Sequence, residues 1–99
     1  MKILLVCSAG ISTSILAVRM RQQSPAGTEI LACQAGSLED FLAGADCVLV
    51  APQIRYQLDR LSALCGEHRV PCELIRPEVY GCLDGRAAYE QACHACGCE

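Results

Sequence analysis

The chain has 99 residues, of which 53% are hydrophobic, and its formal net charge is −3. This length suits one compact domain with one core. The eight lysine and arginine residues are scattered and form no basic stripe, which argues against nucleic acid as a partner. The apolar run at the amino end is too short for a signal-peptide core or a membrane span, so we expect a cytoplasmic protein that does not itself span the membrane.

The alternation of strand and helix patterns along the chain predicts the fold. A continuous apolar run over 47–50 is typical of a strand covered on both faces, and Ser37 and Asp84 are candidate helix N-caps. The pattern predicts an α/β fold, with a four-stranded parallel open sheet, helices on both faces and a ligand site beyond the carboxyl ends of the strands. In chain order, the predicted elements are strand 2–6, helix 13–23, strand 28–34, helix 38–43, strand 46–51, helix 53–68, strand 71–75 and helix 84–93.

Nine cysteines make the chain unusually rich in thiols. An odd number, in a chain without a recognisable targeting segment, favours reduced thiols over a disulfide framework. Packing in the core is the expected role of the cysteines inside predicted strands or on a predicted helix, because free cysteine is among the most buried residue types. These residues are Cys33, Cys47, Cys65 and Cys72.

Cys7 ends the first predicted strand and begins a loop of small and hydroxyl-bearing residues that leads into the first helix. Small residues let the backbone curl and expose successive N–H groups, and the helix N-terminus adds a positive field. Such a loop stabilises a thiolate and holds a phosphate-sized anion. Cys7 is therefore the candidate nucleophile, and the candidate phosphate-binding residues are Ser8, Ala9, Gly10, Ile11, Ser12, Thr13 and Ser14.

The same loop lacks the residues that define other phosphate sites. It has neither the Gly-Lys-Ser/Thr of a nucleotide-binding loop nor the three glycines of a dinucleotide fingerprint. Cysteine-dependent phosphatases clamp phosphate with an arginine six residues after the cysteine, where this chain has Thr13. Hydrolysis is therefore disfavoured, and a protein that holds a phosphoryl group and passes it on fits better.

Three motifs stand in order along the chain: Cys-Ser-Ala-Gly-Ile-Ser-Thr-Ser over 7–14, Leu-Val-Ala-Pro-Gln-Ile-Arg-Tyr over 49–56, and Tyr-Gly-Cys-Leu-Asp-Gly over 80–85. Together they resemble the enzyme IIB component of the lactose/cellobiose (chitobiose) class of the bacterial phosphoenolpyruvate-dependent sugar phosphotransferase system. The resemblance covers most of residues 1–93, which we expect to form a single IIB domain. Residues 94–99 are expected to form a Cys-rich tail.

The resemblance implies a Cys loop like that of the low-molecular-weight tyrosine phosphatases. It also implies a protein-phosphohistidine-sugar phosphotransferase, in which Cys7 takes a phosphoryl group from a phosphohistidine of enzyme IIA and passes it to a sugar bound by the membrane permease enzyme IIC. The chain would need no cofactor for this reaction. Candidate residues at the rim of the site, where a partner would dock, are Gln53, Arg55, Tyr56, Tyr80 and Gly81.

Two features depart from the family pattern. Arg76 stands where an acidic residue is expected, and the cysteines from Cys93 to Cys98 have no counterpart in the pattern. Two alternative functions remain open. One is a low-molecular-weight-type cysteine phosphatase or arsenate reductase, against which Thr13 counts. The other is a thiol-rich, metal-binding regulatory module, which only the terminal cysteines favour; a single cluster without a second ligand pair leads us to expect no metal site.

Overall fold

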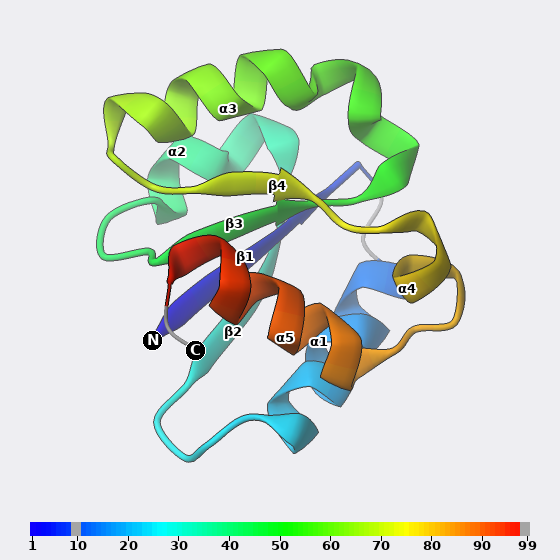
Figure 1. Ribbon diagram of the computed structural model, residues 1–99. Helices are drawn as coiled ribbons and strands as arrows, with labels where there is room; N and C mark the ends of the chain where they lie inside the picture. The colour runs from blue at the N-terminus through cyan, green and yellow to red at the C-terminus, as the bar shows by residue number, and fades with distance from the viewer. Residues whose placement is uncertain (9–10, 98–99) are drawn as a thin grey trace.

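Four parallel strands form one sheet, in the order β2-β1-β3-β4, in the computed structural model of the chain, which describes residues 1–8 and 11–97 (Figure 1). The central strands β1 and β3 are buried along almost their whole length because both sheet faces are covered. The predicted parallel four-stranded sheet is therefore confirmed. The strands are β1 (Lys2–Cys7), β2 (Glu29–Gln34), β3 (Cys47–Val50) and β4 (Cys72–Leu74).

Helices cover both faces of the sheet (Figure 1). On one face lie α1 (Ile11–Gln23) and α5 (Gly85–Cys96), which pack against each other, and on the other lie α2 (Leu38–Phe41) and α3 (Leu58–Glu67). A further short helix, α4 (Pro77–Gly81), connects β4 to α5 beside the first turn of α1. Two 3-10 helices precede α2 and α3: η1 (Ala35–Ser37) and η2 (Pro52–Gln57).

The sheet divides the core into two layers. Ile3 and Leu5 of β1 belong to the layer under α1 and α5, whereas Leu4 and Val6 belong to the layer under α2 and α3. Successive side chains of a strand point to opposite faces, so this alternation directs Cys7 toward the side of the sheet that α1 covers. The strand thus sets the direction of the thiol.

The expected role of the other cysteines in core packing is confirmed. Cys33, Cys47 and Cys65 are buried, and Cys72 is half-buried against the layer under α2 and α3. All four are free thiols. They fill the interior as small apolar side chains do.

Three predicted features of the helices are wrong. The helix expected over 53–68 begins instead as the 3-10 helix η2, because the backbone of Ile54 is non-helical (φ −114°, ψ 27°) while its side chain is buried, and the regular α-helix starts only at Leu58. Ser37 makes no capping hydrogen bond with its side chain. The last helix continues beyond residue 93 to Cys96, where Gly97 ends it with a φ of 73°.

The edge of β4 is covered by a side chain of α5. The Gln91 amide nitrogen Nε2 donates to the carbonyl oxygen of Leu74 at 2.7 Å and to Glu73 Oε1 at 3.2 Å. Its amide oxygen Oε1 accepts from the backbone N–H of Arg76 at 3.3 Å. The Gln91 side chain therefore contacts backbone groups and the Glu73 side chain at the end of β4, the outermost strand.

Candidate functional site

Cys7 is the last residue of β1 and lies where the strand order changes direction. From β1 the chain moves outward to β2 on one side, and then returns to β3 and β4 on the other. In parallel α/β sheets the crevice beyond the carboxyl ends of the strands at such a switch point is the usual ligand site. The Cys7 side chain is 5% exposed, and its Sγ lies 3.9 Å from the carbonyl oxygen of Cys33 on the neighbouring strand.

Ser8 follows Cys7 directly, and helix α1, which begins at Ile11, carries the other hydroxyl side chains of the predicted loop. Ser8, Ser12 and Ser14 are exposed, whereas Thr13 is fully buried. The first turn of α1 carries no acidic residue, so nothing on it opposes the positive field of the helix N-terminus. Two predicted loop residues, Ala9 and Gly10, lie outside the described residues, as does the Ile11 side chain.

Tyr80, a predicted rim residue, contacts Thr13, a residue of the predicted phosphate-binding loop. The two hydroxyl oxygens lie 3.1 Å apart, which joins the first turn of α1 to α4 across 67 residues of sequence. Tyr80 is half-buried, and Gly81 at the end of α4 is exposed. No local pattern in the sequence links Thr13 to Tyr80, so this contact was not predicted. The only sequence signal was the Tyr-Gly motif itself.

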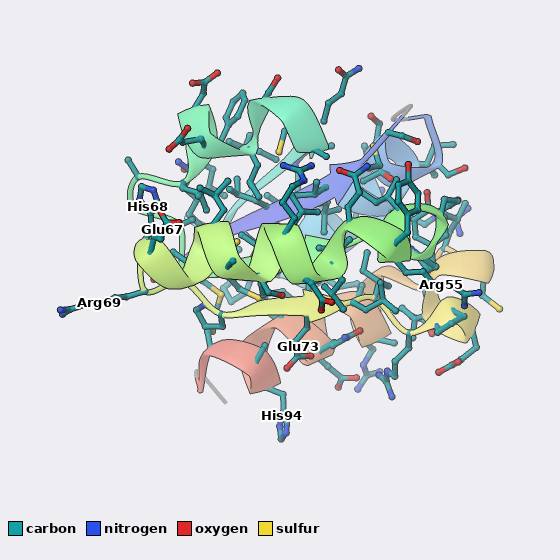
Figure 2. All side chains as sticks on the ribbon, turned by 90° about the horizontal axis from the view of Figure 1, so that it is seen from above. Arg55, Glu67, His68, Arg69, Glu73 and His94 are labelled. Carbon is teal, nitrogen blue, oxygen red and sulfur yellow. The ribbon has the colours of Figure 1, made fainter. Side chains whose placement is uncertain are left out.

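The other predicted rim residues follow β3. Gln53, Arg55 and Tyr56 are exposed on η2, and the Tyr56 side chain is 77% exposed. The backbone N–H of Ala51 donates to the carbonyl oxygen of Val6 at 2.8 Å, which fixes the start of η2 to the end of β1. Figure 2 shows Arg55 at the end of the molecule where α4 lies, and Arg69 at the opposite end.

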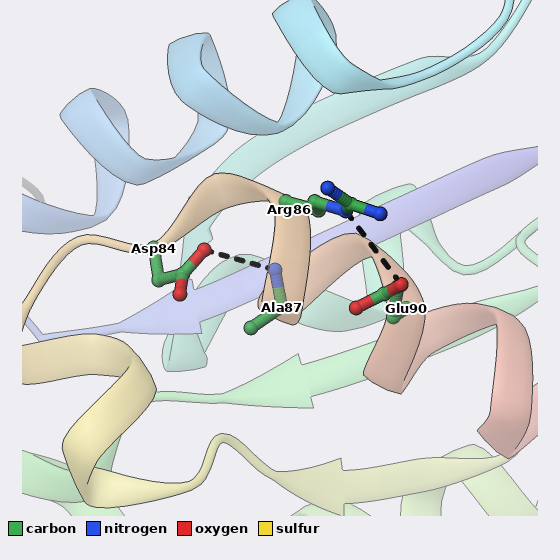
Figure 3. Close-up of polar contacts among 4 residues, drawn as sticks. All are labelled: Asp84, Arg86, Ala87 and Glu90. Atoms are coloured by element: carbon green, nitrogen blue, oxygen red, sulfur yellow. Dashed lines mark hydrogen bonds and ion pairs between the residues drawn. The ribbon is translucent and has the colours of Figure 1, made fainter.

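The start of α5 is fixed against α1 and carries the predicted Asp84 cap. The Asp84 Oδ1 atom accepts a hydrogen bond from the backbone N–H of Ala87 at 3.0 Å, which confirms the cap (Figure 3). Arg86 and Glu90 form an exposed ion pair one turn further on, at 3.8 Å (Figure 3). The Arg19 guanidinium of α1 donates to the carbonyl oxygen of Leu83, just before the cap, at 3.3 Å.

The buried thiols in the sheet and in α3 are kept protonated. Burial raises the pKa of Cys33 to about 11 and the pKa values of Cys47 and Cys65 to about 12, from an ordinary value of 9.0. Because the thiolate is the nucleophilic form, these three side chains are poor nucleophiles at neutral pH. Their role is packing.

The cysteines near the carboxyl end lie on a regular helix. Cys93 and Cys96 belong to α5, and the Cys96 thiol donates to the carbonyl oxygen of Cys93 at 3.6 Å. Cys98 lies outside the described residues. Across residues 1–8 and 11–97, no group of three or more His, Cys, Asp or Glu side chains is placed to hold a metal ion.

The fold and the position of Cys7 define a class of protein: an α/β domain with a cysteine and a helix N-terminus at the switch point of a parallel sheet. The sequence also matches the family model described as PTS system, Lactose/Cellobiose specific IIB subunit, over residues 2–91. The chain therefore belongs to the lactose/cellobiose-specific IIB family of the phosphotransferase system. Domains of this family have the fold of the low-molecular-weight phosphatases.

Relatives support this assignment over nearly the whole chain. The oligo-beta-mannoside-specific EIIB component of Bacillus subtilis (strain 168) is 35% identical over 94 residues, which cover 92% of this chain and 91% of the relative. The galactose-specific EIIB component of Lactococcus lactis subsp. cremoris (strain MG1363) is 29% identical and covers 84% of each chain. Family membership thus gives the chain a general phosphotransferase role in sugar uptake.

Solved structures agree with the fold. The solution structure of the cellobiose-specific phosphotransferase IIB component from Borrelia burgdorferi has a TM-score of 0.80 and 33% identity, and the match covers 98% of this chain and 92% of that one. The lactose-specific IIB component domain from Streptococcus pneumoniae has a TM-score of 0.83 at 16% identity, with 96% of each chain covered. No helix within the described part of this chain is long and apolar enough to cross a membrane.

Proposed function

We propose that the chain is a phosphoryl carrier, in which Cys7 takes a phosphoryl group from a phosphohistidine of enzyme IIA and passes it to a sugar bound by the membrane permease enzyme IIC. The position of Cys7 supports this proposal most strongly. Cys7 ends β1 at the switch point of the sheet, and the next regular element along the chain is a helix of 13 residues that begins at Ile11. The proposed activity is that of a cytoplasmic protein-phosphohistidine-sugar phosphotransferase without a cofactor.

In the first step, the Cys7 thiolate attacks phosphorus while the P–N bond of the phosphohistidine breaks. The electron pair of that bond returns to the imidazole nitrogen, which takes up a proton from solvent to give neutral histidine, and a thiophosphate forms on Sγ. Negative charge on the transferring oxygens is stabilised by backbone N–H groups at the start of α1 and by the exposed hydroxyls of Ser8 and Ser12. The proposed cradle is Ser8, Ala9, Gly10, Ile11, Ser12, Thr13 and Ser14.

In the second step, a sugar hydroxyl oxygen attacks phosphorus and the S–P bond breaks. The sulfur leaves as the thiolate, so Cys7 is regenerated, and the hydroxyl proton is released as the sugar phosphate forms. Both steps depend on alignment and charge stabilisation, which a thiol at the end of a parallel strand and the N–H groups of a helix N-terminus are suited to supply.

Thr13 favours transfer over hydrolysis. At the position where a cysteine phosphatase has its phosphate-clamping arginine, this chain has a buried hydroxyl group that contacts Tyr80. Without a guanidinium there, the loop is less suited to stabilise a water-derived transition state. We therefore expect almost no turnover of a generic aryl phosphate, whereas a low-molecular-weight-type phosphatase would turn it over rapidly.

The exposed residues that follow β3 and end α4 are proposed to receive the partners. Gln53, Arg55 and Tyr56 on η2, and Gly81 on α4, lie on segments that follow the carboxyl ends of β3 and β4. The loop after β1 opens at the same edge, because the strands are parallel. A donor protein that covers these residues would bring its phosphohistidine to Cys7.

The decisive experiment is phosphoryl transfer to purified protein. The radiolabelled phosphohistidine form of an enzyme IIA of this class should label the chain, and peptide mass spectrometry should place the phosphate on Cys7. Cys7→Ser should accept no label. Cys82→Ser is the matched control, because it removes an exposed thiol on a different segment, and it should be labelled like the wild type. Full labelling of Cys7→Ser would contradict the proposal.

A further inference from the structure

Thr13 is the one fully buried polar residue among those that the structure describes. Its hydroxyl oxygen lies 3.1 Å from the hydroxyl oxygen of Tyr80, so the two groups satisfy each other. Buried hydroxyl groups are nearly always paired, because an unpaired one loses its hydration without compensation. In this structure the Tyr80 hydroxyl is the side-chain partner that satisfies Thr13.

Tyr80 is itself firmly held. Its backbone N–H donates to the carbonyl oxygen of Arg76 at 3.0 Å, and its own carbonyl oxygen accepts from the backbone N–H of Leu83 at 3.0 Å. Its ring packs against the core layer that contains Leu16 and Val79. The hydroxyl group of Tyr80 is thus a fixed point on α4, which lies beside the start of α1 (Figure 1).

Thr13 lies in the first turn of α1, six residues after Cys7. The first backbone N–H groups of a helix have no acceptor within the helix, and they are the donors that an anion at the helix N-terminus uses. The N–H groups of Ile11, Ser12 and Thr13 belong to the same helical turn, so a contact that holds Thr13 also bears on the placement of the other two.

We propose that Tyr80 is a positioning residue for phosphoryl transfer, because its hydroxyl group ties Thr13, and with it the first turn of α1, to α4. The proposal rests on the proposed function of Cys7. Tyr80 would act through Thr13, by holding in place the N–H groups at the start of α1 that stabilise the transferring phosphoryl group. Thr13 stands at the position of the phosphatase arginine, and its side chain is buried with its hydroxyl group against the hydroxyl group of Tyr80.

Tyr80→Phe tests the proposal by removing one hydroxyl group and keeping the ring. We expect kcat for transfer from the radiolabelled enzyme IIA phosphohistidine to Cys7 to fall about ten- to a hundred-fold, because small misalignments of donor groups cost this much. KM for the donor should stay the same, since the Tyr80 hydroxyl is directed at Thr13. Tyr89→Phe is the matched control: Tyr89 is a half-buried tyrosine that packs against the same core layer from α5, and the loss of its hydroxyl group should leave transfer unchanged.

A double variant separates positioning from stability. Tyr80→Phe alone leaves the Thr13 hydroxyl buried without its partner, whereas Thr13→Val combined with Tyr80→Phe removes both hydroxyls and should restore the melting temperature. Transfer should remain slow in the double variant, because α1 and α4 are no longer tied. Thr13→Ser keeps the hydroxyl and should retain most of the activity.

Two results would overturn the inference alone: wild-type transfer by Tyr80→Phe, or full recovery of transfer by the double variant. Absence of label on Cys7 in the wild-type protein would instead overturn the proposed function, and this inference with it. Melting temperatures measured for each variant ensure that all rates refer to folded protein.

Discussion

Gly85 of α5 approaches the backbone of Arg19 of α1 so closely that a Cβ atom at Gly85 would lie 2.4 Å from the Arg19 carbonyl carbon. Gly85 is buried, and the residue before it, Asp84, caps α5. The two helices that cover one face of the sheet therefore touch through a residue without a side chain. Any larger residue must separate them or shift the start of α5.

We expect Gly85→Ala to destabilise the protein by about 1–3 kcal/mol, the usual cost of overpacking. Gly66→Ala is the matched control, because Gly66 lies on α3 with open space where a Cβ atom would stand, and alanine there should stabilise the helix by about 0.5–1 kcal/mol. Urea unfolding of both variants measures the difference. Equal effects of the two substitutions would contradict the close contact.

Removal of the Asp84 cap should weaken the start of α5. Asp84→Ala deletes the acceptor for the Ala87 N–H, and we expect a loss of about 1 kcal/mol of stability. Asp84→Asn keeps an oxygen acceptor and should lose little. Glu90→Ala, which breaks only the exposed pair with Arg86, should have a much smaller effect. Thermal unfolding of the three variants compares them, and an unchanged midpoint for Asp84→Ala would argue against the cap.

Alkaline pH should destabilise the protein through its buried thiols. The pKa is raised to about 11 for Cys33 and to about 12 for Cys47 and Cys65, from 9.0, so above pH 9 the unfolded chain loses protons that the folded chain keeps. The contribution of these thiols to the free energy of unfolding is therefore complete below pH 9. It falls as the pH rises toward 12, by at most about 1.4 kcal/mol per pH unit for each thiol.

Denaturant unfolding under reducing conditions, at a series of pH values from 8 upward, measures this loss. Cys47→Ala removes one of the three thiols and should make the decline with pH shallower, whatever its effect on stability at pH 8. A free energy of unfolding that stays constant between pH 9 and pH 11 in the wild type would show that the thiols ionise equally in both states.

Tyr56 should affect partner binding without affecting folding. Its ring is 77% exposed on η2, so under the proposed function Tyr56→Ala should raise KM for the phosphorylated enzyme IIA several-fold while kcat and the melting temperature stay close to wild type. Phe41→Ala on α2, the loss of an aromatic side chain that is 37% exposed, is the control and should leave KM unchanged. Equal KM values for Tyr56→Ala and the wild type would remove Tyr56 from the docking surface.

The fold was predictable because its signals are local. The apolar run over 47–50 indicated a strand covered on both faces, and the cysteine at the end of the first strand indicated the edge at which the site lies. Helix α4 was missed because its five residues are too few for a helical period to show. The non-helical backbone of Ile54 was missed because burial of its side chain, a tertiary effect, outweighs the helical pattern that continues from 53 to 68.

Within the candidate site, the place of Cys7 at the end of the first strand could be predicted from the sequence, but the contact between Thr13 and Tyr80 could not. Thr13 was assigned to the loop from its place after Cys7, and Tyr80 to the rim from its motif. Their hydroxyl contact joins residues 67 apart, and only the packing of α4 beside α1 brings them together. The approach of Gly85 to Arg19 has the same origin.

The side-chain amide of Gln91 covers backbone groups at the outer edge of the sheet, where β4 ends. An outermost strand offers free backbone groups on which another chain can add a strand and begin to aggregate. The Leu74 carbonyl and the Arg76 N–H flank Ile75 on one side of β4, and a fifth parallel strand would use this pair. Gln91 already occupies both groups. Strand addition at this end of β4 therefore requires that α5 first release its glutamine.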